Sequence, residues 1–309
     1  MSIEFDLDPE MRAFIARYLE VSANLSTATS VSQQRQSYEL ICREFCYDHA
    51  TGIKVSDETV EGRHGPIGLR HYHYQPNPNC AAQIVFLHGG GFILGSLDSH
   101  DDICAELCAT TGFDVVSIDY RLAPEHLHAV QLDDVHDAFL AIRQQCSILV
   151  GVSAGATLSA ALCHRLRGSD QMPAAQLLIY PSLGGDRFDL ESYRCNANAP
   201  LLTTQDIMFY RAARSGEREL PFDDAEFYPL VATDFKGLAP TEAFSADIDP
   251  LRDDAALYVE KLHQAGVYAR SHNETGLTHD YLRARHLSRK AATSFKNICQ
   301  AITRLSKKA

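Results

Sequence analysis

The sequence predicts an α/β protein with a mostly parallel central sheet flanked by helices. Short apolar strand patterns alternate with helical patterns, near residues 83–87, 114–119, 147–151, 175–180, 241–246 and 267–273. This alternation is typical of right-handed β–α–β crossovers. Ligands of such sheets bind at the carboxyl ends of the strands, so the functional residues are expected there.

Further elements are predicted before and within this series. Asp8 and Pro9 begin a helix that runs to about residue 21, and residues 31–48 form a second, amphipathic helix. Strands near 53–60 and 65–74 follow. Residues 184–236 then interrupt the alternation with Gly-rich, acidic and helical material, including a helix at 203–215, and a long helix ends the chain.

Composition excludes several classes of function. The formal net charge of the 309 residues is −12 and no basic stripe occurs, which disfavours nucleic acid and anionic membranes as partners. A small neutral substrate is expected instead. The N-terminus has no basic and apolar leader pattern, and no apolar run of about eighteen residues occurs, so the protein is expected to be cytoplasmic.

The nine cysteines are expected to be reduced thiols, because their number is odd and disulfides are rare in the cytoplasm. Cys42 with Cys46, and Cys104 with Cys108, have the i, i+4 spacing of one helix face. No Cys-x-x-Cys pair or Cys/His quartet accompanies them, so buried apolar thiols are favoured over a metal site. Neither a metal nor an organic cofactor is expected.

A candidate nucleophile lies between the strand at 147–151 and a helical pattern at 154–167. The pentapeptide Gly151-Val152-Ser153-Ala154-Gly155 puts Ser153 on a sharp turn that exposes its hydroxyl at the end of the sheet. A Cβ at Gly151 or Gly155 would collide with the closely approaching backbone, and Ser153 is expected in a strained φ/ψ region. The Ala154 amide points from the helix start toward negative charge beside Ser153.

A glycine run supplies further backbone donors. The buried-strand pattern at 83–87 ends in His88, followed by Gly89, Gly90 and Gly91, whose amides are unshielded by side chains. We expect Gly90, Gly91 and Ala154 to form an oxyanion hole, with Gly89 shaping the loop. The alternative, a phosphate-binding loop, would require Gly-x-x-x-x-Gly-Lys-Ser/Thr or Gly-x-Gly-x-x-Gly, and neither pattern is present.

The acid has two candidates, Asp247 and Asp249. Asp249 is favoured because a catalytic acid sits just past a strand, whereas Asp247 is expected to remain within it. Pro250 suits the first turn of a helix running to Leu262, and Asp253 and Asp254 are then explained as carboxylates favoured by the dipole of that helix.

The candidate base is His279, one β/α unit after Asp249 and before the last helix. Other histidines fit less well. His71 and His73 alternate with tyrosines and are expected on the solvated face of an edge strand, and His263 and His286 are expected inside helices. His126 and His128 stay open as alternatives, because they lie in a loop near the site.

The order of oxyanion loop, Ser, acid and His is the order found in α/β-hydrolases. The chain resembles the bacterial hormone-sensitive-lipase-like esterases of that superfamily, and among them the bacterial acetyl esterases. The resemblance rests on the segments 88–92, 120–126, 151–155 and 249–254 with His279, and is especially close over 86–100 and 34–40. The chain departs from the family pattern at Val152, where Asp is usual, at Gly155-Ala156 instead of Gly-Gly, and at Asp280-Tyr281 after the histidine.

The resemblance implies hydrolysis of short-chain carboxylic esters, acetyl to butyryl, by a Ser153–His279–Asp249 triad. It also implies a helical cap formed by residues 1–48 and 184–236 over an α/β-hydrolase core of residues 49–183 and 237–309. Phe92, Leu201, Leu202 and Ile207 are expected to close the acyl pocket, and a homodimer is compatible with the sequence. Two other classes stay open: a serine amidase or peptidase of the same superfamily, and a non-catalytic binding or regulatory protein of the same fold.

Overall fold

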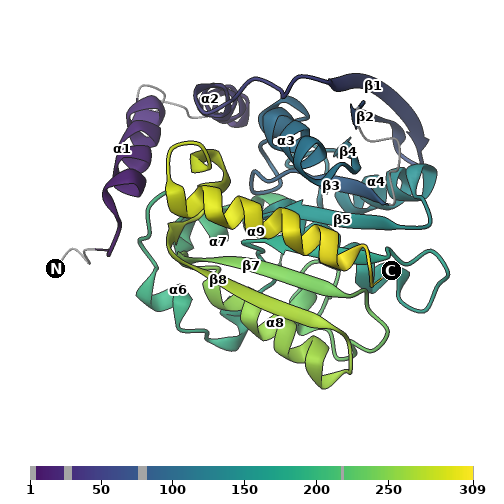
Figure 1. Cartoon of the computed structure of the whole chain (residues 1–309). Helices are drawn as coiled ribbons and strands as arrows, with labels where there is room; N and C mark the ends of the chain where they lie inside the picture. Colours follow the sequence, from purple (N-terminus) through teal and green to yellow (C-terminus); the bar gives the residue numbers. More distant parts are fainter. Residues whose placement is uncertain (1–4, 24–29, 76–81, 217–218, 309) are drawn as a thin grey trace.

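The computed structural model describes residues 5–23, 30–75, 82–216 and 219–308 and shows a twisted sheet with helices on both faces (Figure 1). The strands lie in the order β1-β2-β4-β3-β5-β6-β7-β8. β1 pairs antiparallel with β2 and β2 with β4, whereas every other neighbouring pair is parallel. The predicted mostly parallel sheet is therefore confirmed. The strand bounds are β1 Ile53–Gly62, β2 Gly65–Tyr74, β3 Gln83–Leu87, β4 Asp114–Asp119, β5 Ser147–Val152, β6 Ala175–Ile179, β7 Thr241–Ile248 and β8 Ala269–Thr278.

Two layers of helices cover the sheet. α3 and α9 pack on one face, and α4, α5 and α8 pack on the other, so that a separate apolar core forms on each side. The helix bounds are α1 Pro9–Ala23, α2 Val31–Glu44, α3 Asp101–Thr111, α4 His128–Ile142, α5 Ala154–Leu166, α6 Ser192–Cys195, α7 Thr204–Ser215, α8 Arg252–Gln264 and α9 Arg289–Leu305. Short 3₁₀ turns are η1 Asp98–His100, η2 Gly185–Phe188, η3 Pro229–Val231 and η4 Tyr281–Ala284.

The burial of the central strands explains their sequence pattern. Every residue of β3, β5 and β6 is buried, because helices cover both faces of these parallel strands. Such strands read as continuous apolar runs instead of alternating ones. Their carboxyl ends lead directly into His88, Ser153 and Tyr180.

The first two helices lie against the C-terminal part of the chain. Figure 1 shows α1 and α2 near the loop that precedes α9. The Arg289 backbone amide donates to the Glu10 carboxylate of α1 over 2.8 Å, and Arg283 of η4 donates to the Tyr38 hydroxyl of α2 over 2.9 Å. Residues 184–236 contribute η2, α6, α7 and η3. Within the described residues, none of the helices has the length and apolar composition that a membrane span requires.

Several predicted boundaries are wrong for tertiary reasons. α2 ends at Glu44 instead of residue 48, because Phe45 leaves the helical conformation and buries its ring 4.9 Å from that of Phe14. Cys46 therefore lies beyond the helix and is exposed, unlike the buried Cys42. The eight cysteines within the described residues form no disulfide, and Cys80 lies outside them.

Two histidine placements are also corrected. β2 is not an edge strand, since β1 covers it, and His71 pairs with Glu58 across that contact. His286 lies in the turn between η4 and α9 instead of inside a helix. The helix after Asp249 begins at Arg252, past Pro250. Residues 249–251 form a turn instead, in which Asp249 accepts from the Leu251 amide over 2.9 Å and from the Arg252 amide over 3.1 Å.

Candidate active site

Ser153 occupies the turn between β5 and α5, as the pentapeptide predicts. Its backbone has φ +52° and ψ −114°, a region that non-glycine residues rarely adopt and that surrounding structure must enforce. The Ser153 amide donates to the Ile179 carbonyl over 2.9 Å, which fixes the turn against β6. A Cβ on Gly155 would overlap the Leu87 carbonyl oxygen, and one on Gly151 would overlap that of Gly155. The expected need for both glycines is confirmed.

Three side chains from three strand ends meet at this turn. The Ser153 Oγ lies 3.0 Å from His279 Nε2, and His279 Nδ1 lies 2.6 Å from Asp249 Oδ2. A carboxylate only accepts hydrogen bonds, so Nδ1 carries the imidazole proton and Nε2 is left to accept from the serine hydroxyl. Asp249 is fully buried, and its other oxygen accepts from the Leu251 amide over 2.9 Å. The arrangement permits proton transfer from Ser153 to His279.

The glycine loop after β3 lies beside Ser153. Gly90 and Gly91 have φ of +120° and +60°, and the Gly90 carbonyl accepts from the Leu94 amide over 2.8 Å. Among the described residues, no protein acceptor is recorded for the amides of Gly90, Gly91 and Ala154. A Cβ on Gly89 would lie 3.1 Å from the Val152 carbonyl oxygen, so this glycine permits close approach of the loop to the turn.

His88 orients the loop from beneath. Its buried Nδ1 lies 2.8 Å from the Gly89 carbonyl oxygen, and the Tyr120 hydroxyl donates to the His88 carbonyl over 2.8 Å. Because a trans peptide points its C=O and N–H in opposite directions, this bond turns the Gly90 amide away from His88. Burial lowers the pKa of His88 to about 4, so the ring is neutral. It stacks on the Tyr120 ring at 4.3 Å.

A family profile described as the alpha/beta hydrolase fold matches residues 84–283, which include the glycine loop, the serine turn, Asp249 and His279. The chain belongs to the α/β-hydrolase family.

Similar proteins are esterases. Esterase LipI of Mycobacterium tuberculosis is 35% identical over 242 residues, covering 74% of this chain and 75% of that protein. Ethyl acetate hydrolase of Pseudomonas putida is 31% identical over 271 residues, covering 80% and 82%. The solved structure of ester-hydrolase EH1AB1 from the Lake Arreo metagenome superposes with a TM-score of 0.87 at 27% identity, covering 97% of this chain and 98% of that one. The predicted resemblance to bacterial esterases, and with it the prediction of an enzyme, is confirmed.

The hydrolase has a cavity of about 350 Å³ over Ser153 and His279. Its wall combines strand-end loops with α1, α2 and the 184–236 segment. Phe92, Leu201, Leu202 and Ile207, the residues expected in an acyl pocket, all contribute to it. Leu202 and Ile207 pack with Leu251 and Tyr193 in one apolar cluster.

The alternative acid and base candidates lie elsewhere. Asp247 lies within β7, and its carboxylate accepts from Asn273 over 3.2 Å and from the Gly276 amide over 3.3 Å. His126 and His128 are absent from the cavity wall. The structure brings neither of these histidines to Ser153.

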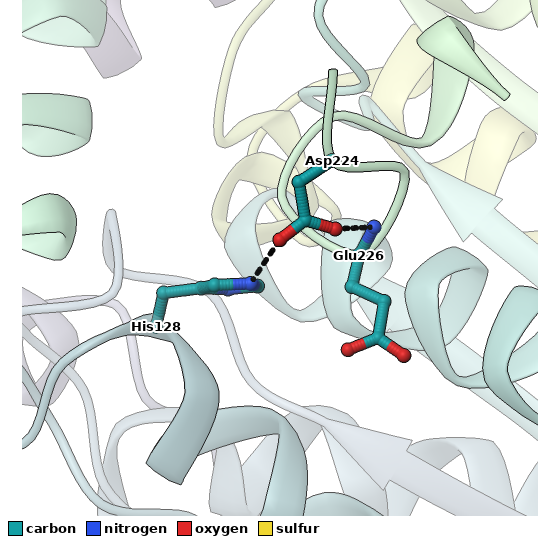
Figure 2. Close-up of side chains that lie close together, drawn as sticks. All are labelled: His128, Asp224 and Glu226. Atoms are coloured by element: carbon teal, nitrogen blue, oxygen red, sulfur yellow. Dashed lines mark hydrogen bonds and ion pairs between the residues drawn. The ribbon is translucent and has the colours of Figure 1, made fainter. Parts of the chain in front are cut away.

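His128 instead joins a cluster with Asp224 and Glu226, shown in Figure 2. One ligand atom from each residue lies within 4.8 Å of the others, a spacing that a cation could bridge. However, Asp224 already accepts from the Glu226 amide over 2.8 Å and lies 3.2 Å from His128 Nε2, while the Glu226 carboxylate accepts from Arg165 over 2.5 Å. These partners link α4 and α5 to the segment before η3.

Sequence reasoning missed the residues that hold the acid loop. The Asn196 amide group donates to the carbonyls of Asp247 and Asp249, each over 3.0 Å. Asp254, expected only to complement a helix dipole, is buried and accepts from three consecutive amides, those of residues 183, 184 and 185, and from the Tyr193 hydroxyl. Both contacts join segments more than fifty residues apart, for which the local pattern has no signal.

Proposed function

We propose that this enzyme hydrolyses short-acyl carboxylic esters through Ser153, His279 and Asp249. The observation that carries the proposal is the pair of hydrogen bonds from Ser153 to His279 and from His279 to Asp249, at 3.0 and 2.6 Å. The esterase relatives support the same bond type.

The proposed reaction has two steps. His279 Nε2 takes the Ser153 proton while Oγ attacks the ester carbonyl carbon, and the same Nε2–H then protonates the departing alkoxide. Water attacks the resulting acyl-enzyme with His279 again as base, which releases the carboxylic acid and restores Ser153. Asp249 keeps the imidazole in the required tautomer and stabilises its charged form. Gly90, Gly91 and Ala154 supply backbone donors to the oxyanion, and the loss of one such donor typically costs ~10²–10³ in rate.

The preference for short acyl chains rests on the cavity. We infer that α1, α2 and residues 184–236 act as a cap, since all three supply its wall. Leu202, Ile207 and Leu251 form a packed apolar surface that limits the acyl chain. Each methylene that fits adds roughly 1–3 kcal/mol of discrimination, and one that does not fit costs as much.

A p-nitrophenyl ester series from acetate to palmitate, beside an amide analogue, tests the proposal. We expect kcat/KM to peak at two to four acyl carbons and fall steeply by eight to ten, with no activation at an emulsion interface. Ser153→Ala should abolish turnover while the circular dichroism spectrum stays unchanged. Retained turnover by the folded variant contradicts the nucleophile, and a peak at long acyl chains contradicts the acyl preference alone. A cytoplasmic location and a homodimer stay predictions, for cell fractionation and light scattering to test.

A further inference from the structure

The catalytic geometry defines which side of the cavity receives the alcohol of the ester. His279 Nε2 protonates the leaving oxygen, so the alcohol lies on the His279 side of Ser153. The next residue, Asp280, also lines the cavity, and it has a left-handed backbone with φ +61°. Its carboxylate accepts from Arg283 over 2.9 Å, and Arg283 donates to the Tyr38 hydroxyl of α2 over 2.9 Å. Helix α2 therefore lines the side of the cavity that receives the alcohol.

Three phenols line the same cavity as Asp280. Tyr18 of α1, Tyr38 of α2 and Tyr210 of α7 all line the cavity. Burial raises the pKa of each, and the nearby Asp280 charge adds to the effect, so all three keep their hydroxyl protons at neutral pH. For Tyr18 and Tyr210, no hydrogen bond from the hydroxyl to another described residue is recorded. Tyr38 accepts from Arg283 and keeps its own proton to donate.

Helix α2 adds amide and hydroxyl groups on the same face. Gln34, Ser37 and Tyr38 have the i, i+3, i+4 spacing that aligns side chains on one side of a helix, and all three line the cavity. Within the described chain, the Gln34 side chain has no recorded partner. The apolar part of the cavity is the cluster that contains Leu202, Ile207 and Leu251, and the Tyr210 side chain packs against it. The side chains of α2 therefore add neutral polar groups to the part of the cavity that contains Asp280.

The charged groups of the wall do not favour an ionic alcohol. Asp280 pairs with Arg283, and Arg211 lies 2.5 Å from Asp186. The Asp206 carboxylate accepts from the Thr203 amide over 2.8 Å. Arg211 and Asp280 therefore each pair with an opposite charge, whereas Asp206 is held by the amide and hydroxyl of its own helix N-cap. The other polar groups of the wall are neutral donors and acceptors.

We propose that this side of the cavity binds a neutral polyhydroxylated alcohol, with Gln34 and Ser37 as specificity-determining residues. The inference rests on the proposed function, because it uses His279 to define the alcohol side. Hydroxyls of such an alcohol replace lost water contacts by bonds to the Gln34 amide and the phenols. The Ser37 hydroxyl donates to the Gln33 carbonyl over 2.8 Å, so it accepts from the alcohol. An alkyl group in the same place leaves these polar groups unsatisfied, which penalises alkyl esters.

The test compares 1-acetylglycerol with n-propyl acetate, two acetates whose three-carbon alcohols differ only in hydroxyl groups. The measured quantity is the ratio of their kcat/KM values in the same preparation, so that any loss of folded protein cancels. The wild-type enzyme should favour 1-acetylglycerol by more than the ratio of the two alkaline hydrolysis rates. Gln34→Leu and Ser37→Ala should each lower the enzymatic ratio roughly 2- to 10-fold.

Gln36→Leu is the matched control, because Gln36 is exposed on the same helix and absent from the cavity wall. Its ratio should equal that of the wild type. If n-propyl acetate is hydrolysed well but the ratio does not change in the Gln34 and Ser37 variants, the inference is overturned and the esterase function stands. If neither acetate is hydrolysed, the proposed function itself has failed and the inference with it.

Discussion

Two aspartates near the end of β7 lie only two residues apart, yet their carboxylates have different surroundings. Asp249 follows the strand, is fully buried and faces His279, whereas Asp247 is still within the strand and holds Asn273 and Gly276. Strand alternation does not distinguish them, because residues two apart lie on the same face of a strand. The end of the strand decides, because β7 stops at Ile248 and the chain turns at Pro250.

We predict that Asp249→Asn lowers kcat by up to ~10⁴-fold, because the amide no longer holds the Nδ1–H tautomer of His279. Asp247→Asn serves as the matched comparison and should lower kcat far less. Steady-state kinetics on an acetate ester measure both variants. A larger loss for Asp247→Asn would move the acid to that residue.

Gly90→Ala is predicted to lower kcat by ~10²–10³-fold, the effect of losing one oxyanion donor. The substituted residue would have φ +120°, and its Cβ would overlap the Leu94 carbonyl oxygen, so the loop must shift. Gly237→Ala is the control, since Gly237 also has positive φ but no atom within 4 Å of an added Cβ. Kinetics are normalised to folded protein by active-site titration. Normal turnover by Gly90→Ala would assign the glycine run to packing.

The residues of the proposed triad could be located from the sequence, whereas those that support them could not. Ser153, Asp249 and His279 each follow a strand with a turn residue nearby, so local pattern places them. Arg283 is buried and joins Asp280, Ser99 and Tyr38, which lie in three separate segments. A contact of that kind depends on packing between elements that are distant in the sequence, so no residue spacing predicts it.

Helix α7 packs against the glycine loop through two side chains one turn apart, Tyr210 and Arg214. The Tyr210 ring lies so close to Gly91 that an added Cβ would come within 2.5 Å of it. The buried Arg214 guanidinium lies 4.1 Å from the Phe92 ring centre and 4.5 Å from that of Phe227. Phe92 has φ +69°, a conformation that a bulky residue keeps only when its surroundings enforce it. Arg214 is one such constraint.

We therefore predict that Arg214→Met lowers kcat roughly 10-fold with little change in KM, because the cation–π contact that holds Phe92 is lost. Stability should change little, since burial lowers the pKa of Arg214 to about 9 and its removal relieves that desolvation. Arg214→Lys keeps the charge but loses the flat guanidinium, so its kcat should lie between those of the wild type and of Arg214→Met. An unchanged kcat in a folded Arg214→Met enzyme would restrict the residue to packing of the 184–236 segment.

Elements were easier to predict than their ends. Continuous apolar runs identify β3, β5 and β6, because these strands are buried on both faces. β8 extends to Thr278, five residues beyond its predicted end, because it pairs with β7 as far as Ile248. Its added residues include the half-buried Glu274 and the exposed Thr275, so the hydrophobic pattern underestimates a strand that backbone pairing sustains.

At the scale of the whole molecule, buried neutral histidines make stability depend on pH. Burial lowers the pKa of His88 and of His164 to about 4, and that of His100 well below its usual value. The unfolded chain binds protons below pH ~6.5, while the folded one does not until about pH 4. These groups therefore contribute stability that is fully present above pH ~6.5 and is lost as the pH falls toward 4.

We predict that the free energy of unfolding falls as the pH drops from 6.5 toward 4, by up to ~1.4 kcal/mol per pH unit for each such histidine. Urea unfolding at several pH values measures the slope. His164→Gln should reduce this slope, because Gln does not titrate and can still accept a hydrogen bond from the Tyr258 hydroxyl. His73→Gln is the control, since His73 is half exposed beside Asp114. Equal slopes in all three proteins would contradict the assignment.

The cavity wall combines the N-terminal helices, through Tyr18 and Gln34, with the segment that follows β8, through His279 and Asp280. A molecule that fills the cavity contacts both regions at once. Its binding free energy is then added to the cost of lifting α1 and α2 away from the rest, because detached helices leave it no complete wall. Protease cleavage within the first two helices should accordingly slow as the cavity fills. The bound molecule then acts as a noncovalent crosslink between the N-terminal helices and the segment after β8.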